Sequence, residues 1–176
     1  PMWGGGVLIG MMGMGLLTAF FRISKRWIAI VGCVGTALGM GALAFGALTL
    51  NQSFIMPSLI FMGLFTGLFN VGALSMMMDM TVEGATGLYM GLWGMAQAFG
   101  NGTASFSGGA LHTGLIETGF MAPNVAYFTI FGIESIGMIA AAAIVWHLSV
   151  KAFYINHKAT LARKDTLRAM EAGAIA

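Results

Sequence analysis

Residues 79–100 read DMTVEGATGLYMGLWGMAQAFG, and acids lead into a long apolar run. Small residues recur in this run three or four positions apart, at Gly87, Gly91, Gly94 and Ala98. That spacing places them on one face of an α-helix. Membrane helices use such faces for close backbone contact, because lipid gives helices little reason to bury larger apolar side chains between them. The stretch therefore predicts a membrane helix with one face of small residues.

The composition of the whole chain also indicates a lipid environment. Of the 176 residues, 58% are hydrophobic and 8% are charged, and there are 27 glycines and 16 methionines. A soluble domain carries about a quarter charged residues. The single cysteine, Cys33, lies in an apolar run, which excludes a disulfide framework and a cysteine-based metal site. The net charge of +2 gives no reason to expect a nucleic-acid partner.

Five apolar runs are long enough to cross a bilayer, which takes roughly 20 helical residues each. The predicted spans lie near residues 4–21, 27–50, 56–78, 87–111 and 123–150. The intervening segments are RISKRW (22–27), NQSFIMP (51–57), DMTVEGAT (79–86) and HTGLIETGFMAP (112–123). A basic tail, residues 151–176, follows the last span. The sequence therefore predicts an all-α, polytopic membrane helix bundle.

The basic residues predict the orientation of this bundle. All lie in the first intervening segment or in the tail: Arg22, Lys25, Arg26, Lys151, Lys158, Arg163, Lys164 and Arg168. With five spans these two regions lie on the same side, and the positive-inside rule makes that side cytoplasmic. The first residue then lies on the far side. We therefore expect at least one upstream helix, so that the chain is the C-terminal part of a longer protein.

Similar small-residue faces run along the other predicted spans. They comprise Gly6, Gly10 and Gly13; Gly32, Gly35, Gly39, Ala42 and Gly46; Gly63 and Gly67; and Gly102, Ser105 and Gly109, which continue the face beyond Ala98. The plain interpretation is packing within the bundle. The functional alternative is that some faces meet a missing half of the protein, a partner protein or a flat cofactor. The glycines alone leave these alternatives open.

The acids Asp79 and Glu83 have a structural interpretation too. Both precede a predicted helix, where negative charge interacts favourably with the helix dipole by roughly 0.3–1 kcal/mol. Thr81 or Thr86 is the expected cap of that helix.

This stretch also resembles the PucC family. The matching residues are Asp79, Met80, Thr81, Gly87, Gly91, Leu92, Trp93, Gly94, Gln97 and Ala98, followed by Gly108, Gly109, Ala110 and Leu111. The resemblance implies a major facilitator superfamily fold of twelve helices, of which the five spans would be helices 8–12. The match is specific over residues 79–111. It departs from the family after Leu111, where His112 and Thr113 stand in place of a typical Arg-Asp pair.

The resemblance implies a function in photosynthesis. Members of this family are associated with the assembly of light-harvesting complexes and with the delivery of (bacterio)chlorophyll. The expected partners are the missing N-terminal half of the fold, light-harvesting or reaction-centre subunits and membrane lipids. The expected location is a bacterial photosynthetic membrane, inner or intracytoplasmic, with the C-terminus in the cytoplasm. The expected cofactor is (bacterio)chlorophyll, and we expect no enzyme activity, since no set of catalytic residues or metal cluster is evident.

Polar residues within the predicted spans supply the other candidate sites. Glu134 is the acid placed well inside a span, where a charge costs about 2.5–3.5 kcal/mol. It is expected to be neutral and hydrogen-bonded between helices, or alternatively to couple protons or contact a ligand. Proton coupling by Glu134 would make the protein a proton-coupled transporter of a small solute. A further alternative function is that of a structural subunit of a larger complex. Asn70, Gln97 and Asn101 are expected to link helices by hydrogen bonds.

Candidate ligands for a pigment magnesium are few. Imidazole and amide oxygen suit this ion, which leaves Gln97, His112 and His147 as possible pigment ligands, with His157 in the tail. His147 stands beside Trp146 near the end of the fifth span and also fits an interfacial polar residue. The tail itself mixes basic, aromatic and aliphatic residues, so we expect it to lie on the anionic cytoplasmic leaflet.

Overall fold

The computed structural model describes residues 2–21, 23–81, 85–117, 119, 121–148, 153 and 155. These residues form five long α-helices and no strand: α1 (Met2–Phe20), α2 (Lys25–Leu48), α3 (Ile55–Asp79), α4 (Thr86–His112) and α5 (Pro123–His147). A 3-10 turn, η1 (Gln52–Phe54), precedes α3, and a π-helical turn, η2 (Thr113–Glu117), follows α4. The predicted all-α bundle is confirmed. Glu83, His157 and nearly all of the tail lie outside the described residues.

The helices begin and end close to the predicted breaks for local reasons. Ser24 before α2 and Ala122 before α5 have extended backbones, which cannot continue a helix. Pro123 then opens α5, where its missing N–H costs nothing and its fixed φ suits the first turn. After α2 the chain turns through Leu50, a non-glycine residue with a positive φ of 53°.

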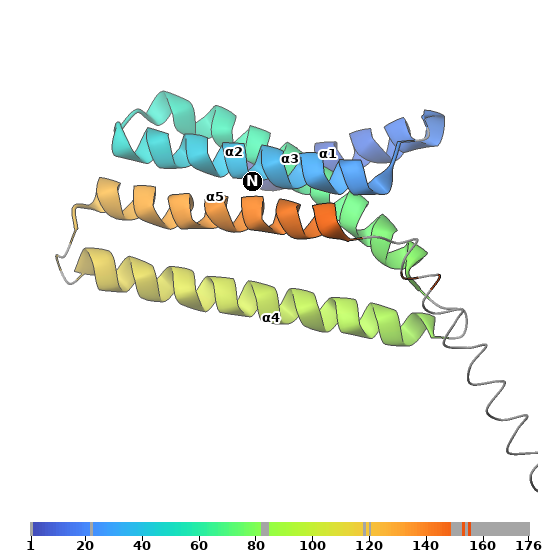
Figure 1. Ribbon diagram of the computed structural model, residues 1–176. Coiled ribbons are helices and arrows are strands. Elements are labelled where there is room, and N and C mark those ends of the chain that lie inside the picture. The colour runs from blue at the N-terminus through green and yellow to red at the C-terminus, as the bar shows by residue number, and fades with distance from the viewer. Residues whose placement is uncertain are drawn as a thin grey trace, which may run out of the picture.

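α2 is the centre of the bundle. It packs against α3 on one side and α5 on the other, and α1 packs against α3. Twelve residues of α2 are buried, whereas α4 has no buried residue. In Figure 1, α4 lies at the outer edge of the arrangement, next to α5 and away from α1, α2 and α3.

Close backbone approach holds α1 against α3. A Cβ atom added at Gly6 or Gly10 of α1 would lie less than 3.0 Å from a carbonyl oxygen of α3. The same holds in reverse at Gly63 and Gly67 of α3, which face carbonyl oxygens of α1. The predicted packing role of these glycines is confirmed. Gly13, by contrast, has no atom within 4 Å of such a Cβ position and faces open space.

The glycines of α2 serve the same purpose against α3. A Cβ at Gly32 would collide with the backbone of Phe69, and one at Gly39 with Met62. In return, Gly72 of α3 leaves room for Ala29 of α2. The small-residue face of the second predicted span therefore packs inside the bundle, as expected.

Short hydroxyl side chains, rather than the predicted amides, link the helices. Ser135 Oγ of α5 donates a 2.8 Å hydrogen bond to the carbonyl oxygen of Ala37 in α2. Thr36 of α2 and Thr66 of α3 bring their hydroxyls within 3.4 Å. Within the described residues, none of the predicted amides, Asn70, Gln97 and Asn101, makes an interhelical hydrogen bond. Gln97 and Asn101 lie on the exposed α4, where no described helix is close enough to accept or donate such a bond.

Four helical segments among the described residues are long and apolar enough to cross a membrane: Met2–Phe20, Lys25–Leu48, Gln52–Asp79 and Pro123–His147. The 27 residues of α4 also exceed the length needed, since about 20 suffice. Its seven glycines, together with Gln97 and Asn101, lower its hydropathy. The fourth span, residues 87–111, therefore stays a prediction.

Contacts at the helix ends establish which loops lie at the same end of the bundle. Lys25 at the start of α2 forms an ion pair with Asp79 at the end of α3. Trp27 of α2 meets Trp146 of α5 edge-on, with 5.3 Å between the ring centroids. We call this end, with Lys25 and Arg26, the basic end. The turn at η1 and the α4–α5 connection lie at the opposite end, as the figure shows (Figure 1).

The predicted orientation can be tested by cysteine labelling. Ser24 at the basic end and Asn51 at the opposite end are both exposed, and the native Cys33 is buried. An impermeant maleimide added outside should label Asn51→Cys in sealed spheroplasts and Ser24→Cys only after lysis. Labelling of both positions from the same side would contradict the orientation.

Candidate functional site

The face of α4 that carries the family-motif residues is uncovered. Gly87, Gly91, Gly94 and Gly109 have no atom within 4 Å of a Cβ position, and Gln97 is exposed. Trp93 on the same helix is half-buried. The prediction that this small-residue face packs closely is therefore not met by any described part of the chain. The pattern is the same as in α1 and α2, but no helix among the described residues packs on this face of α4.

The acid and the threonine of the motif lie at the end of α3 rather than at the start of α4. Asp79 is the last residue of α3 and pairs with Lys25. Thr81 Oγ1 donates a 3.0 Å hydrogen bond to the Met77 carbonyl oxygen of α3. The expected cap at Thr81 or Thr86 is wrong, because Ala85 occupies the N-cap position of α4 and has no capping side chain.

The Lys25–Asp79 pair also has a local electrostatic cause. A carboxylate at the end of α3 lies near the negative pole of that helix, which disfavours it. The Lys25 ammonium offsets this repulsion and links α2 to α3. Both side chains are more than 40% exposed, so the pair contributes no more than about 1 kcal/mol. Sequence reasoning placed both residues on the same side of the membrane, but it missed the pairing, because 54 residues separate them.

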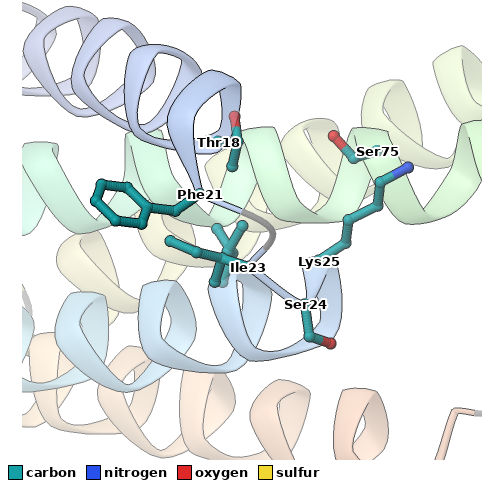
Figure 2. A pocket seen from close by; sticks show the side chains of 7 residues that line it. Thr18, Phe21, Ile23, Ser24, Lys25 and Ser75 are labelled. Carbon is teal, nitrogen blue, oxygen red and sulfur yellow. The ribbon is translucent and has the colours of Figure 1, made fainter.

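A pocket of about 450 Å³ lies beside this pair at the basic end. Its walls come from the end of α1, the start of α2 and Ser75 of α3. Figure 2 shows the Lys25 side chain extending from the start of α2 toward Ser75. Since Lys25 is already paired with Asp79, its charge is partly neutralised, and the pocket offers an incoming anion a weak site.

The second feature of the basic end is an aromatic cluster. Arg26 holds its guanidinium 5.7 Å from the centre of the Trp146 ring, which in turn contacts Trp27. The next residue, His147, is exposed and makes no hydrogen bond or ring contact within the described residues. Tryptophan and arginine at a helix end are typical of a membrane interface. This environment fits the interfacial alternative for His147.

His112 lies at the opposite end and is oriented by a neighbour. Its Nε2 atom is 3.1 Å from the hydroxyl oxygen of Tyr127 in α5, and the two rings meet at 5.6 Å between centroids. In the tautomer that donates from Nε2 to the tyrosine oxygen, Nδ1 keeps its lone pair. A second hydrogen bond of this kind is the usual way in which a protein orients a metal-binding imidazole.

Glu134 lies midway along α5 and is exposed. It makes no hydrogen bond or ion pair with any other described residue. The expected hydrogen bond to another helix is therefore not formed within the described part of the chain. An unpaired carboxyl at this depth requires a partner, a cavity or a proton, because lipid cannot solvate its charge.

The structure does not gather the candidate residues into one site. Gln97 lies mid-way along α4, His112 lies at the opposite end, and His147 lies at the basic end. α1 and α4 make no substantial contact and lie on either side of α5 (Figure 1). The described helices therefore form no groove lined by both the first and the fourth spans. Among the described residues, no group of three His, Cys, Asp or Glu side chains could hold a metal ion.

Comparison with known proteins gives a family and two relatives. The profile of a family described as "PUCC protein" matches residues 1–153. The "Bacteriochlorophyll synthase 44.5 kDa chain" of Rhodobacter capsulatus is 36% identical over 148 residues, covering 80% of this chain and 33% of that protein. An "Uncharacterized protein in puhA-bchM intergenic region" of the same organism is 31% identical over 108 residues, covering 61% and 22%. The chain thus spans a third or less of these relatives' length. No solved structure matches.

Proposed function

Because this chain belongs to the PUCC family, we propose that it is part of a membrane assembly factor for a photosynthetic light-harvesting or reaction-centre complex, which handles or delivers (bacterio)chlorophyll. The observation that carries the proposal is the uncovered face of α4, which holds the most specific family residues and whose glycines have no atom of the described residues within 4 Å of a Cβ position. Small residues on a helix face allow another helix to pack closely against it, so we expect this face to have a partner.

Three kinds of partner fit this proposal. The remaining part of a longer protein would cover some of the exposed helix surface, since the chain corresponds to 33% of the first relative. Light-harvesting or reaction-centre subunits are helical and could pack on glycine faces in the same manner as α1 on α3. Lipid would cover the rest. The proposed location is the photosynthetic inner or intracytoplasmic membrane of a bacterium, with the basic end and the C-terminus in the cytoplasm.

Two other functions have a specific observation in their favour. The name of the first relative describes a synthase chain, which favours a catalytic step in pigment synthesis. The unpaired Glu134 favours proton-coupled transport of a small solute, since acids within transporter spans often carry protons. Our proposal requires neither a reaction nor a titrating group.

Deletion of the gene and replacement by a Glu134→Gln variant test the three functions together. We expect the deletion strain to make chemically complete bacteriochlorophyll but to accumulate at least about tenfold less antenna complex. Glu134→Gln should restore the antenna, because an amide keeps the shape and hydrogen-bonding capacity of the acid. Pigment extracts analysed by mass spectrometry and membrane absorption spectra provide the measurements.

The outcomes are distinguishable. Incomplete pigment precursors in the deletion strain would favour the synthase function over ours. A stable Glu134→Gln protein that fails to restore the antenna, and that loses a solute gradient in vesicles, would favour the transporter. A deletion strain with normal antenna levels would contradict the assembly function itself.

A further inference from the structure

A second cavity, of about 660 Å³, lies at the end of the bundle opposite the basic end, between α2, η1, α3 and α5. Its volume is within the roughly 300–1,000 Å³ typical of small-molecule sites. Leu43, Met62 and Phe131 line it one to two helical turns inside the helix ends, and Gln52 and Asn124 line it at the ends themselves. The cavity therefore has an apolar interior and a rim with two amide side chains.

The direction of the cavity follows from the helix register. Pro123 and Phe131 both line it, and they are about 12 Å apart along α5 at about 1.5 Å per residue. In the predicted topology, the rim lies where the helices leave the bilayer and the interior reaches into the hydrocarbon layer. An amphiphile with a polar head and a hydrocarbon tail has this distribution of polarity. The pocket at the basic end lacks it, since Lys25, Ser24 and Thr18 line it together with apolar groups.

The aromatic wall of the cavity leads directly to an oriented imidazole. Tyr127 lines the cavity and stacks on Phe131, and its hydroxyl oxygen is 3.1 Å from His112 Nε2. In the tautomer that donates from Nε2 to the tyrosine oxygen, the remaining ring nitrogen, Nδ1, is available to a metal. A single side chain, Tyr127, therefore separates the cavity, which would hold an apolar tail, from His112, which would hold the metal of the head group.

We propose that this cavity holds the hydrocarbon tail of a magnesium tetrapyrrole whose metal is held by His112. The inference rests on the proposed pigment-handling function and adds to it a binding site, a metal ligand and a requirement for the tail. Tyr127 is a positioning residue: it fixes the imidazole and forms part of the tail wall. The amide groups of Gln52 and Asn124 stand at the rim, where the ester that joins tail and ring would lie.

The decisive experiment removes the tail from the pigment. Purified protein, in the complete form produced in its native membrane, is stripped of pigment and titrated with bacteriochlorophyll and with the same pigment after hydrolysis of its tail ester. We expect the intact pigment to bind more than about tenfold more tightly, because even two buried methylenes correspond to such a change. Absorption and visible circular dichroism measure the binding without any assay of assembly.

Substitutions then locate the tail and the head. Ala47→Phe fills the cavity that Ala47 lines, and it should abolish the advantage of the intact pigment while leaving the tail-less pigment unchanged. Ala140→Phe, at an exposed alanine of α5, should leave both affinities unchanged. His112→Phe should weaken the binding of both pigments by the same factor and change the absorption spectrum of the pigment that still binds. Tyr127→Phe should have a smaller effect in the same direction.

Each other outcome contradicts a definite part of this inference. Equal affinity of wild-type protein for the two pigments overturns the tail site without requiring any variant to fold. A phospholipid that copurifies and is lost in Ala47→Phe, with pigment affinity unaffected, would make the cavity a lipid site instead. Pigment binding that is insensitive to His112→Phe overturns the metal ligand. Failure of wild-type protein to bind either pigment would contradict the proposed function as well as the site.

Discussion

Gly10→Ala should destabilise the bundle by about 1–3 kcal/mol, the usual cost of forcing extra atoms into a packed contact. The added methyl group would lie less than 3.0 Å from the Leu64 carbonyl oxygen, which is backbone and cannot move aside as a flexible side chain could. α1 must therefore separate from α3. Gly67→Ala, on the facing side of the same contact, should have a similar effect for the same reason.

Gly13→Ala is the matched control for this prediction. It lies three residues further along α1 and makes the same chemical change, but no atom lies within 4 Å of the new methyl position. Alanine is also the better helix former, by about 1 kcal/mol, so the control should be neutral or slightly stabilising. Thermal unfolding in detergent micelles, followed by circular dichroism, measures both variants. Equal loss of stability at Gly10 and Gly13 would show that α1 and α3 do not meet as described.

Gly94→Leu should leave the described bundle intact and yet cause a loss of antenna complex of at least about tenfold. Among the described residues, no atom lies within 4 Å of a Cβ at position 94, so the effect of the leucine on folding should remain within about 0.5 kcal/mol. On a face that a partner must approach closely, however, the same side chain prevents contact. This expectation differs from the plain interpretation of the sequence, in which the small-residue face of α4 packs within the bundle.

Gly100→Leu provides the control on the same helix. Gly100 also has open space around it, but it lies about 240° around the axis from Gly94 at about 100° per residue. It should retain both protein and antenna. The measurements are the amount of the protein in membranes, by immunoblot, and the antenna absorption.

The pattern of loss identifies what covers α4. Antenna lost at normal protein levels indicates a functional interface. Loss of the protein in Gly94→Leu alone indicates that the face packs against another part of the same protein. Normal protein and antenna in both variants would contradict any close partner on this face.

Local sequence determined much of this protein. Hydropathy predicted the helices and the breaks between them, because the free energy of moving a side chain from water into lipid depends chiefly on that side chain. Ser24, Ala122 and Pro123 act on the backbone next to them, so the ends of α2 and α5 followed the pattern closely. The motif between Asp79 and Leu111 identified the family, which the match over residues 1–153 confirmed.

Only the tertiary structure decided which small-residue faces have partners. Gly10 and Gly94 carry the same local signal, but a Cβ at Gly10 would meet a carbonyl oxygen of α3, whereas a Cβ at Gly94 would meet no atom of the described residues. The contacts of Lys25 with Asp79 and of His112 with Tyr127 likewise joined residues that no local pattern connects. The physical reason is that periodicity fixes which residues share a face of one helix, whereas the neighbour of that face depends on how all the helices pack together.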